Sequence, residues 1–356
     1  MSSTAKQLVR PEIGALKPYV AATYTEGVLR LNANEAPWSP IAPGTGVNLQ
    51  DLNRYPDERP LELTARLADF YGVDPAQLLV TRGSSEGIDL LIRSFCRAGV
   101  DQCVVNPPTF GMYRVYADVQ GAGIRAVPLL AGDFALDVNG ILDNWGATDK
   151  LAFICTPNNP TGNTVAQADL ERLCTKLNGK GLVVIDAAYT EFADYDPTEL
   201  VCRFDNAVVL RTLSKALGLA GVRCGAVIAS PEIIGYLQQI LPPYSYPKPC
   251  QEAVLAALDP ANRSEQLRRI ALLKEQRERL LSYCQSNPAF VTVWPSNANF
   301  VFVTAADPAA VINATELARV RIRDFSKDPS ALNGFRITVG THDEIDQLIN
   351  ALDTLK

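Results

Sequence analysis

The sequence is almost without histidine: among its 356 residues the single histidine is His342, close to the C-terminal end. A metal site built from several histidines is therefore excluded, and a Ser–His or Cys–His catalytic pair would have to use this one residue. This scarcity argues against most zinc hydrolases and catalytic-triad enzymes.

Paired cysteines, excess positive charge and long apolar runs are also missing. The eight cysteines never form a CxxC spacing and stand among apolar residues, so we expect free thiols and a cytoplasmic location. The formal net charge of −6 argues against nucleic acid or an anionic membrane as a partner. No apolar run reaches the roughly 18 residues that span a bilayer, and the N-terminus lacks the apolar stretch of a signal peptide.

The sequence does have short apolar runs that alternate with helix-length amphipathic segments. This alternation predicts an α/β domain with a mostly parallel sheet, and the length favours a second domain. Strands are expected at Leu78–Thr81, Gln102–Val105, Ile124–Pro128, Leu151–Cys155, Leu182–Asp186, Ala207–Arg211 and Cys224–Ala229, and helices at Leu61–Tyr71, Ser85–Arg97, Gly111–Val119 and Ala168–Asn178.

The pattern changes at residues 241–249, where four prolines in nine residues predict a linker. Beyond it the pattern predicts a smaller α+β unit. Its expected helices are Ser264–Ser286, Ala309–Ala318 and His342–Leu352, and its expected strands are Val291–Trp294, Asn299–Val303, Val320–Arg323 and Gly334–Val339. We therefore expect an N-terminal arm packing on the small domain (1–44), a large domain (45–245) and a small C-terminal domain (246–356).

Polar residues follow the ends of several expected strands, which is where open α/β sheets bind their ligands. Gly83, Ser84 and Ser85 lead into a helix whose free N–H groups could hold a phosphate, although either serine could instead be an ordinary N-cap. The turn Pro157-Asn-Asn-Pro160 could present a carboxamide at fixed geometry or be purely structural.

Asp186 ends an apolar strand and needs a partner if it is buried. It could cap the next turn, or it could be the counter-ion of a cationic ring nitrogen, with Tyr189 as a nearby phenolic donor. Lys215 is preceded by Thr212 and Ser214 and followed by a glycine-rich, nearly apolar loop. Apolar surroundings favour the neutral amine, which is a nucleophile toward carbonyls, whereas a surface lysine is the alternative.

Three arginines complete the candidate set. Arg223, eight residues after Lys215, could clamp a phosphate. Arg323 and Arg336 lie in expected strands, where a structural salt bridge would satisfy each one, but the pair favours a dianion or carboxylate ligand. This combination of groups is what pyridoxal phosphate requires: a lysine, a buried carboxylate, a phenol, an amide and a set of residues that can hold a phosphate.

These motifs resemble the fold-type-I, pyridoxal-phosphate-dependent aminotransferases, and within them the chain is similar to the histidinol-phosphate aminotransferase family from about Ile13 to Leu352. The motifs that carry the resemblance are Leu31-Asn-Ala-Asn-Glu-Ala-Pro37, Asn53-Arg-Tyr-Pro56, Arg82-Gly-Ser-Ser-Glu-Gly87, Pro107-Pro-Thr-Phe-Gly-Met-Tyr113, Pro157-Asn-Asn-Pro-Thr-Gly162, Arg211-Thr-Leu-Ser-Lys215 and Phe335-Arg-Ile-Thr-Val-Gly-Thr341.

The resemblance implies a role for each candidate residue. Lys215 would form the Schiff base with the cofactor and move the proton between Cα and C4′, and Asp186 would pair with the pyridine nitrogen. The other implied cofactor contacts are Asn159 and Tyr189 at O3′, Phe110 on the ring, and Ser84, Ser85, Thr212, Ser214, Arg223 and Tyr55 of the partner subunit at the phosphate. The implied substrate contacts are Arg336, Arg323, Tyr19, Asn34 and Asn299.

The implied protein is a homodimer that catalyses ping-pong transamination between L-histidinol phosphate and 2-oxoglutarate, giving imidazole-acetol phosphate and L-glutamate. Two residues depart from the family: Phe110 stands where tyrosine is common, and Ala187 where glutamate is common. An aromatic amino-acid aminotransferase and a threonine-phosphate decarboxylase are alternatives. A non-catalytic, cofactor-binding regulator is an alternative of another class, although motifs that begin at Leu31 leave no room for a DNA-binding domain.

Overall fold

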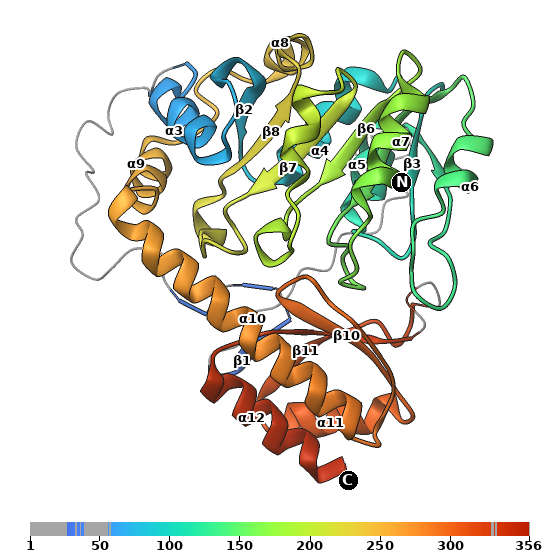
Figure 1. Ribbon diagram of the computed structural model, residues 1–356, viewed down its shortest axis with the longest axis vertical. Coiled ribbons are helices and arrows are strands. Elements are labelled where there is room, and N and C mark those ends of the chain that lie inside the picture. The colour runs from blue at the N-terminus through green and yellow to red at the C-terminus, as the bar shows by residue number, and fades with distance from the viewer. Residues whose placement is uncertain are drawn as a thin grey trace, which may run out of the picture.

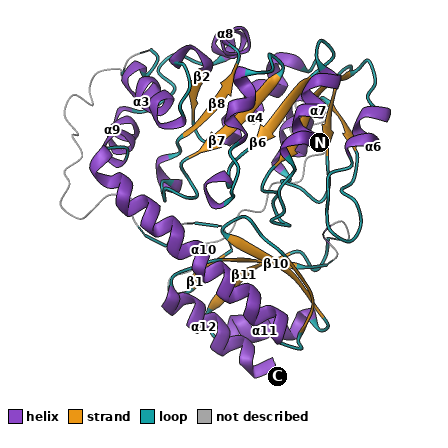
Figure 2. Ribbon diagram, viewed as in Figure 1, coloured by secondary structure: helices purple, strands orange, loops and turns teal. Residues whose placement is uncertain are grey.

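Two β-sheets, each covered by helices, organise the chain, and they lie in the upper and lower parts of Figures 1 and 2. The computed structural model describes residues 27–32, 34–35, 37–38, 56, 58–328, 331 and 333–355. Tyr19 and Tyr55 lie outside the described residues.

The larger sheet has seven strands in the order β2-β8-β7-β6-β5-β3-β4. They are β2 (Leu78–Thr81), β3 (Gln102–Val105), β4 (Gly123–Ala126), β5 (Asp149–Cys155), β6 (Leu182–Asp186), β7 (Ala207–Thr212) and β8 (Gly225–Ala229). Only β8 runs antiparallel to its neighbours among these strands, so the predicted mostly parallel sheet is confirmed. Alternate residues of β6 enter two separate apolar cores, Val183 and Ile185 on one face and Val184 on the other, because helices cover both faces.

Four of the helices around this sheet were predicted from the sequence, and each begins and ends within two residues of its predicted bounds. They are α3 (Leu61–Tyr71), α4 (Ser84–Phe95), α5 (Met112–Gln120) and α7 (Gln167–Leu177). Three further helices were not predicted: α6 (Val138–Asp143), α8 (Pro231–Ile240) and α9 (Lys248–Ala257). The proline-rich linker is shorter than expected, because Pro249 lies in the first turn of α9, where proline fits a helix.

The smaller sheet has five strands in the order β1-β11-β12-β10-β9. They are β1 (Leu29–Leu31), β9 (Phe290–Trp294), β10 (Phe300–Ala305), β11 (Val320–Asp324) and β12 (Phe335–Thr338), with helices α10 (Arg263–Ser286), α11 (Pro308–Leu317) and α12 (His342–Leu352). β1 pairs in parallel with β11, so the chain before the larger sheet contributes a strand to the smaller one.

Three smaller expectations can be checked directly. His342 begins α12, behind the Thr341–Glu344 capping box, as a helix-start residue should. All eight cysteines are free thiols. Among the described helices, none is at once long and apolar enough to pass through a bilayer.

Candidate active site

A cavity of about 390 Å³ lies at the carboxyl ends of β5, β6 and β7 and is closed on its other side by β11 and β12. This volume falls in the range of small-molecule sites. Most of the predicted site residues line it, namely Asn34, Ser84, Ser85, Phe110, Asn159, Asp186, Tyr189, Thr212, Ser214, Lys215, Arg223, Arg323 and Arg336.

The start of α4 forms one end of the cavity. Gly83 is the N-cap residue, with a φ of 75°, and no side chain caps the helix, so the alternative of a capping serine is wrong. The hydroxyls of Ser84 and Ser85 instead belong to the cavity lining. A Cβ on Gly225 of β8 would lie 2.5 Å from the Gly83 carbonyl carbon and 2.6 Å from the Ser84 nitrogen. Glycine at position 225 therefore lets β8 approach the exposed helix terminus, which is suited to bind an anion.

Arg223 and two hydroxyls surround the same helix terminus. A Cβ on Gly83 would lie 2.6 Å from Arg223 Nη2, so the guanidinium lies directly against the start of the helix. Arg223 Nη1 donates to Ser214 Oγ at 3.5 Å, and Thr212 Oγ1 donates to Ser214 Oγ at 3.0 Å. These donors can hold a phosphate group.

Lys215 lies in the loop after β7 and is half-buried. Burial lowers the pKa of its amine from the ordinary 10.5 to about 8, and the guanidinium groups of Arg336 and Arg223 contribute to this lowering. The amine lies 5.9 Å from the ring centre of Tyr189. A substantial fraction of Lys215 is therefore neutral, and hence nucleophilic, near physiological pH.

Asp186 is 2% exposed at the end of β6. Its Oδ2 accepts a hydrogen bond from the hydroxyl of Tyr113 at 2.7 Å, and its Oδ1 accepts one from the Ala188 N–H at 3.2 Å. The carboxylate thus caps the next turn, as one predicted alternative has it, and it also lines the cavity; its pairing with a ring nitrogen stays a prediction. Burial raises the pKa of Asp186, whereas the two hydrogen bonds and Lys215 lower it.

Tyr189 joins the two sides of the cavity. Its hydroxyl accepts from Asn34 Nδ2 at 3.1 Å and from Asn159 Nδ2 at 3.5 Å. Burial raises the pKa of Tyr189 to about 12, so its phenol keeps its proton. Asn299 does not line the cavity; its amide donates to the Asn34 carbonyl oxygen at 3.1 Å and so holds Asn34 in place.

The two asparagines of the proline-bracketed turn have different roles. Asn158 Nδ2 donates to the Pro108 carbonyl at 2.9 Å and to Thr161 Oγ1 at 2.7 Å, which ties two loops together. Asn159 faces the cavity, and its Oδ1 accepts from Arg336.

Arg323 and Arg336 are opposite one another across the antiparallel pair β11–β12. Arg336 is 7% exposed, and its Nη2 donates to the Asn32 carbonyl at 3.1 Å. Arg323 lies 5.6 Å from the ring centre of Phe325. Sequence reasoning placed both arginines on neighbouring strands but missed Phe325, Asp328 and Asn32, which also line the cavity.

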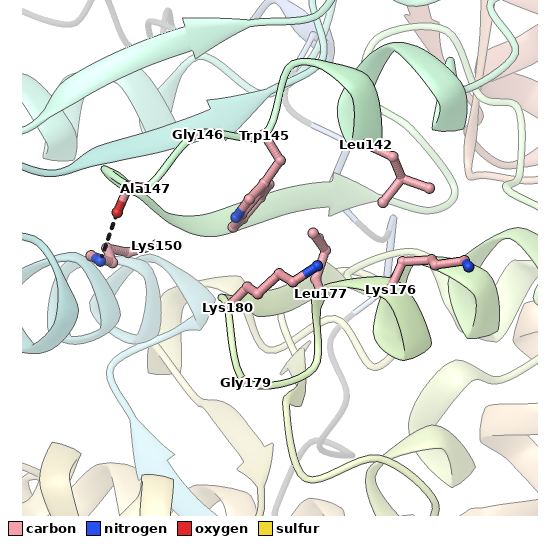
Figure 3. Close-up of a pocket in the computed structure, with 9 residues that line it drawn as sticks. All are labelled: Leu142, Trp145, Gly146, Ala147, Lys150, Lys176, Leu177, Gly179 and Lys180. Carbon is pink, nitrogen blue, oxygen red and sulfur yellow. Dashed lines mark hydrogen bonds between the residues drawn. The ribbon is translucent and has the colours of Figure 1, made fainter.

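A second cavity, of about 580 Å³, lies at the opposite, amino ends of β5 and β6 (Figure 3). Its described lining is Leu142, Trp145, Gly146, Ala147, Lys150, Lys176, Leu177, Gly179 and Lys180, which includes no carboxylate or hydroxyl. Lys150 Nζ donates to the Ala147 carbonyl at 3.1 Å, and the ammonium groups of Lys150 and Lys176 point away from each other. The smaller cavity therefore holds the reactive groups.

Comparison with known proteins gives a consistent result. Residues 46–352 match the family model of aminotransferase class I and II. The chain is 40% identical to a histidinol-phosphate aminotransferase from Stenotrophomonas maltophilia, over 97% of this chain and 95% of that protein, and 39% identical to one from Aeromonas hydrophila, over 98% and 97%. The crystal structure of histidinol-phosphate aminotransferase from Sinorhizobium meliloti in complex with pyridoxal-5′-phosphate superposes with a TM-score of 0.86 over the whole of both chains, at 23% identity.

Proposed function

The chain belongs to the class I and II aminotransferase family, and we propose that it transfers an amino group between L-histidinol phosphate and 2-oxoglutarate, giving imidazole-acetol phosphate and L-glutamate. The observation that carries this proposal is a single cavity that contains the low-pKa amine of Lys215 and the cross-strand pair Arg323 and Arg336. The names of the relatives at about 40% identity support the choice of substrate.

The cavity fits pyridoxal 5′-phosphate, the cofactor of this family. Its donor set contains a phosphate cradle, a buried carboxylate for the ring nitrogen, and an aromatic side chain, Phe110, for one ring face. The cradle consists of Ser84, Ser85, Thr212, Ser214 and Arg223. When bound, the cofactor supplies an electron sink that stabilises the negative charge left when a Cα–H bond breaks.

The residues of the larger sheet would perform the proton transfer. Lys215 Nζ, neutral in a substantial fraction of molecules near its pKa of about 8, takes the proton from the substrate Cα. Asp186 would direct its charge toward the ring nitrogen, while Tyr189 and Asn159 would donate to the cofactor's phenolic oxygen. No histidine is required, which is consistent with the position of the single histidine, His342, outside the cavity lining.

The residues of the smaller sheet would choose the substrate. Arg336 takes the carboxylate of glutamate or the phosphate of histidinol phosphate, and Arg323 adds a second guanidinium for the dianionic phosphate. Asn34 belongs to the same side and is held by Asn299. Tyr19, the remaining expected substrate contact, lies outside the described residues.

The proposal includes a homodimer in which Tyr55 of the partner subunit completes the phosphate site. Arg223, although it lies at the phosphate site, is exposed in the single chain, and this exposure supports a site that a second subunit covers. We retain the division at residues 44 and 245, which the pairing of β1 with β11 supports for the N-terminal arm. The eight free thiols support a cytoplasmic location.

An aromatic amino-acid aminotransferase is the second candidate, because Phe325 adds aromatic surface to the cavity beside Arg323. Single-turnover reactions of the cofactor-loaded protein with histidinol phosphate and with phenylalanine separate the two. We expect kcat/KM to be about 100-fold higher for histidinol phosphate, since charged hydrogen bonds to its phosphate contribute about 1.5–3 kcal/mol each. Equal values would favour the second candidate, and no reaction with histidinol phosphate would overturn the proposal.

A further inference from the structure

The hydroxyl of Tyr113 donates a 2.7 Å hydrogen bond to Asp186 Oδ2, a contact that the proposed function does not use. Tyr113 is the second residue of α5, and its side chain is completely buried. It does not line the cavity, whereas Asp186 does. Tyr113 therefore reaches the reacting groups through Asp186.

Aromatic packing fixes the position of this hydroxyl. The ring of Tyr113 stacks on Phe153 of β5, with centroids 4.8 Å apart and planes 13° from parallel. It also meets Phe110 edge-on at 5.7 Å, and its N–H donates to the Phe110 carbonyl at 3.4 Å. One turn thus positions both the ring of Phe110 in the cavity and the hydroxyl behind Asp186.

The hydrogen bond also favours the charged form of the carboxylate. The titratable groups that face Asp186 are Tyr113 from α5, Cys155 from the end of β5, Tyr189 from the turn after β6 and Lys215 from the loop after β7. Burial raises the pKa of Asp186 above its ordinary value, and the hydrogen bond from Tyr113 is the largest of the influences that limit this rise. Burial and the negative charge of Asp186 raise the pKa of Tyr113, so the phenol remains protonated and donates.

We propose that Tyr113 is a positioning residue of the transamination: its hydroxyl holds the Asp186 carboxylate aimed at the site of the cofactor's ring nitrogen. The role rests on the proposed function, because it presupposes that the cofactor's ring lies against Asp186. It adds to that function a residue from a helix that contributes no other group to the proton transfer.

The first test is Tyr113→Phe, which removes only the hydroxyl. In the half-reaction with glutamate, kcat should fall about tenfold or more, the loss expected for one hydrogen bond to a charged group. The KM for glutamate should stay within about twofold, because Tyr113 does not line the cavity. The pH midpoint of the bound cofactor's absorbance change should rise, because a less firmly protonated ring nitrogen repels the positive charge beside Lys215 less strongly.

Tyr195→Phe is the matched control, since it removes a buried hydroxyl that has no hydrogen-bond partner in the described structure. It should leave kcat and the absorbance midpoint unchanged. If Tyr113→Phe lowers the urea midpoint of the cofactor-free protein but moves neither kcat nor the absorbance midpoint, Tyr113 is merely structural and the proposal is overturned.

The second test repeats Tyr113→Phe in an Asp186→Asn background. If Tyr113 acts through Asp186, the added substitution changes the dissociation constant of pyridoxal phosphate by less than about twofold, whereas independent effects would add. A full additional loss would overturn the proposal. These measurements use glutamate and the cofactor alone, so a failure of histidinol phosphate to react would refute the proposed substrate without deciding the role of Tyr113.

Discussion

The two sides of the cavity are built in different ways. The reaction wall is formed by Asp186, Tyr189 and Lys215 from the larger sheet, and its carboxylate is held from behind by the 2.7 Å hydrogen bond of the buried Tyr113. The substrate wall, formed by Arg323 and Arg336 on β11 and β12, is placed by strand register, and Arg336 also donates to Asn32 and Asn159. Burial shifts the pKa values of the reaction wall, whereas the substrate wall keeps permanent charges, because arginine does not titrate in the physiological range.

The comparison first predicts that damage to the reaction wall affects every substrate. Lys215→Ala should lower the rates of both half-reactions, with glutamate and with histidinol phosphate, on the order of 10⁴-fold, because nucleophile and proton carrier are lost together. Single-turnover absorbance measurements give both rates, and mass analysis after borohydride reduction should find no cofactor attached to the chain. A variant that retains one substrate at near wild-type rate would break the distinction between the walls.

Damage to the substrate wall should instead be selective. Arg323→Ala should reduce kcat/KM for histidinol phosphate roughly 10- to 100-fold, through lost charged hydrogen bonds to the phosphate, and change the glutamate half-reaction by less than about threefold. Arg321→Ala, on the same strand but outside the cavity lining, is the matched control. Equal losses with both substrates would mean that Arg323 stabilises the structure of the site and does not bind the phosphate of the substrate.

The smallest expected effect is on the pH dependence of stability in the cofactor-free protein, and it comes from the charge of Lys215. The pKa of Lys215 is about 8 in the folded protein and near 10.5 in the unfolded chain, so between these pH values the unfolded chain binds more protons. The free energy of unfolding of the wild-type protein therefore increases as the pH rises through this range. Lys215→Met should therefore stabilise the cofactor-free protein most below pH 8, with the difference shrinking as the pH approaches 10.5. Urea midpoints at pH 7, 9 and 10 measure this, and a constant difference would contradict the lowered pKa.

Much of the site was predictable because parallel strands collect their carboxyl ends at one edge of a sheet. Asp186 ends β6, and Lys215 follows β7 within a few residues, so reading the strand ends in order brought them together without any long-range information. The apolar strands themselves were identifiable because helices bury both faces of the larger sheet.

Tyr113 was missed because nothing local distinguishes it. It lies on the buried side of an amphipathic helix and meets Asp186 across 73 positions of sequence, so only the packing of α5 against the sheet reveals the contact. The serines at the start of α4 illustrate a second limit. Their identity suits an N-cap, but the chain uses the left-handed Gly83 there and leaves Ser84 and Ser85 to the cavity.

The close approach at Gly225 has a consequence for how this sequence can vary. A side chain at this position would collide with backbone atoms of Gly83 and Ser84, which cannot move aside as a flexible side chain could. In a randomised library, position 225 should therefore accept almost nothing but glycine, although Gly225 does not line the cavity. The absence of a side chain at position 225 is thus as necessary for the shape of the anion-binding site as the residues that form it.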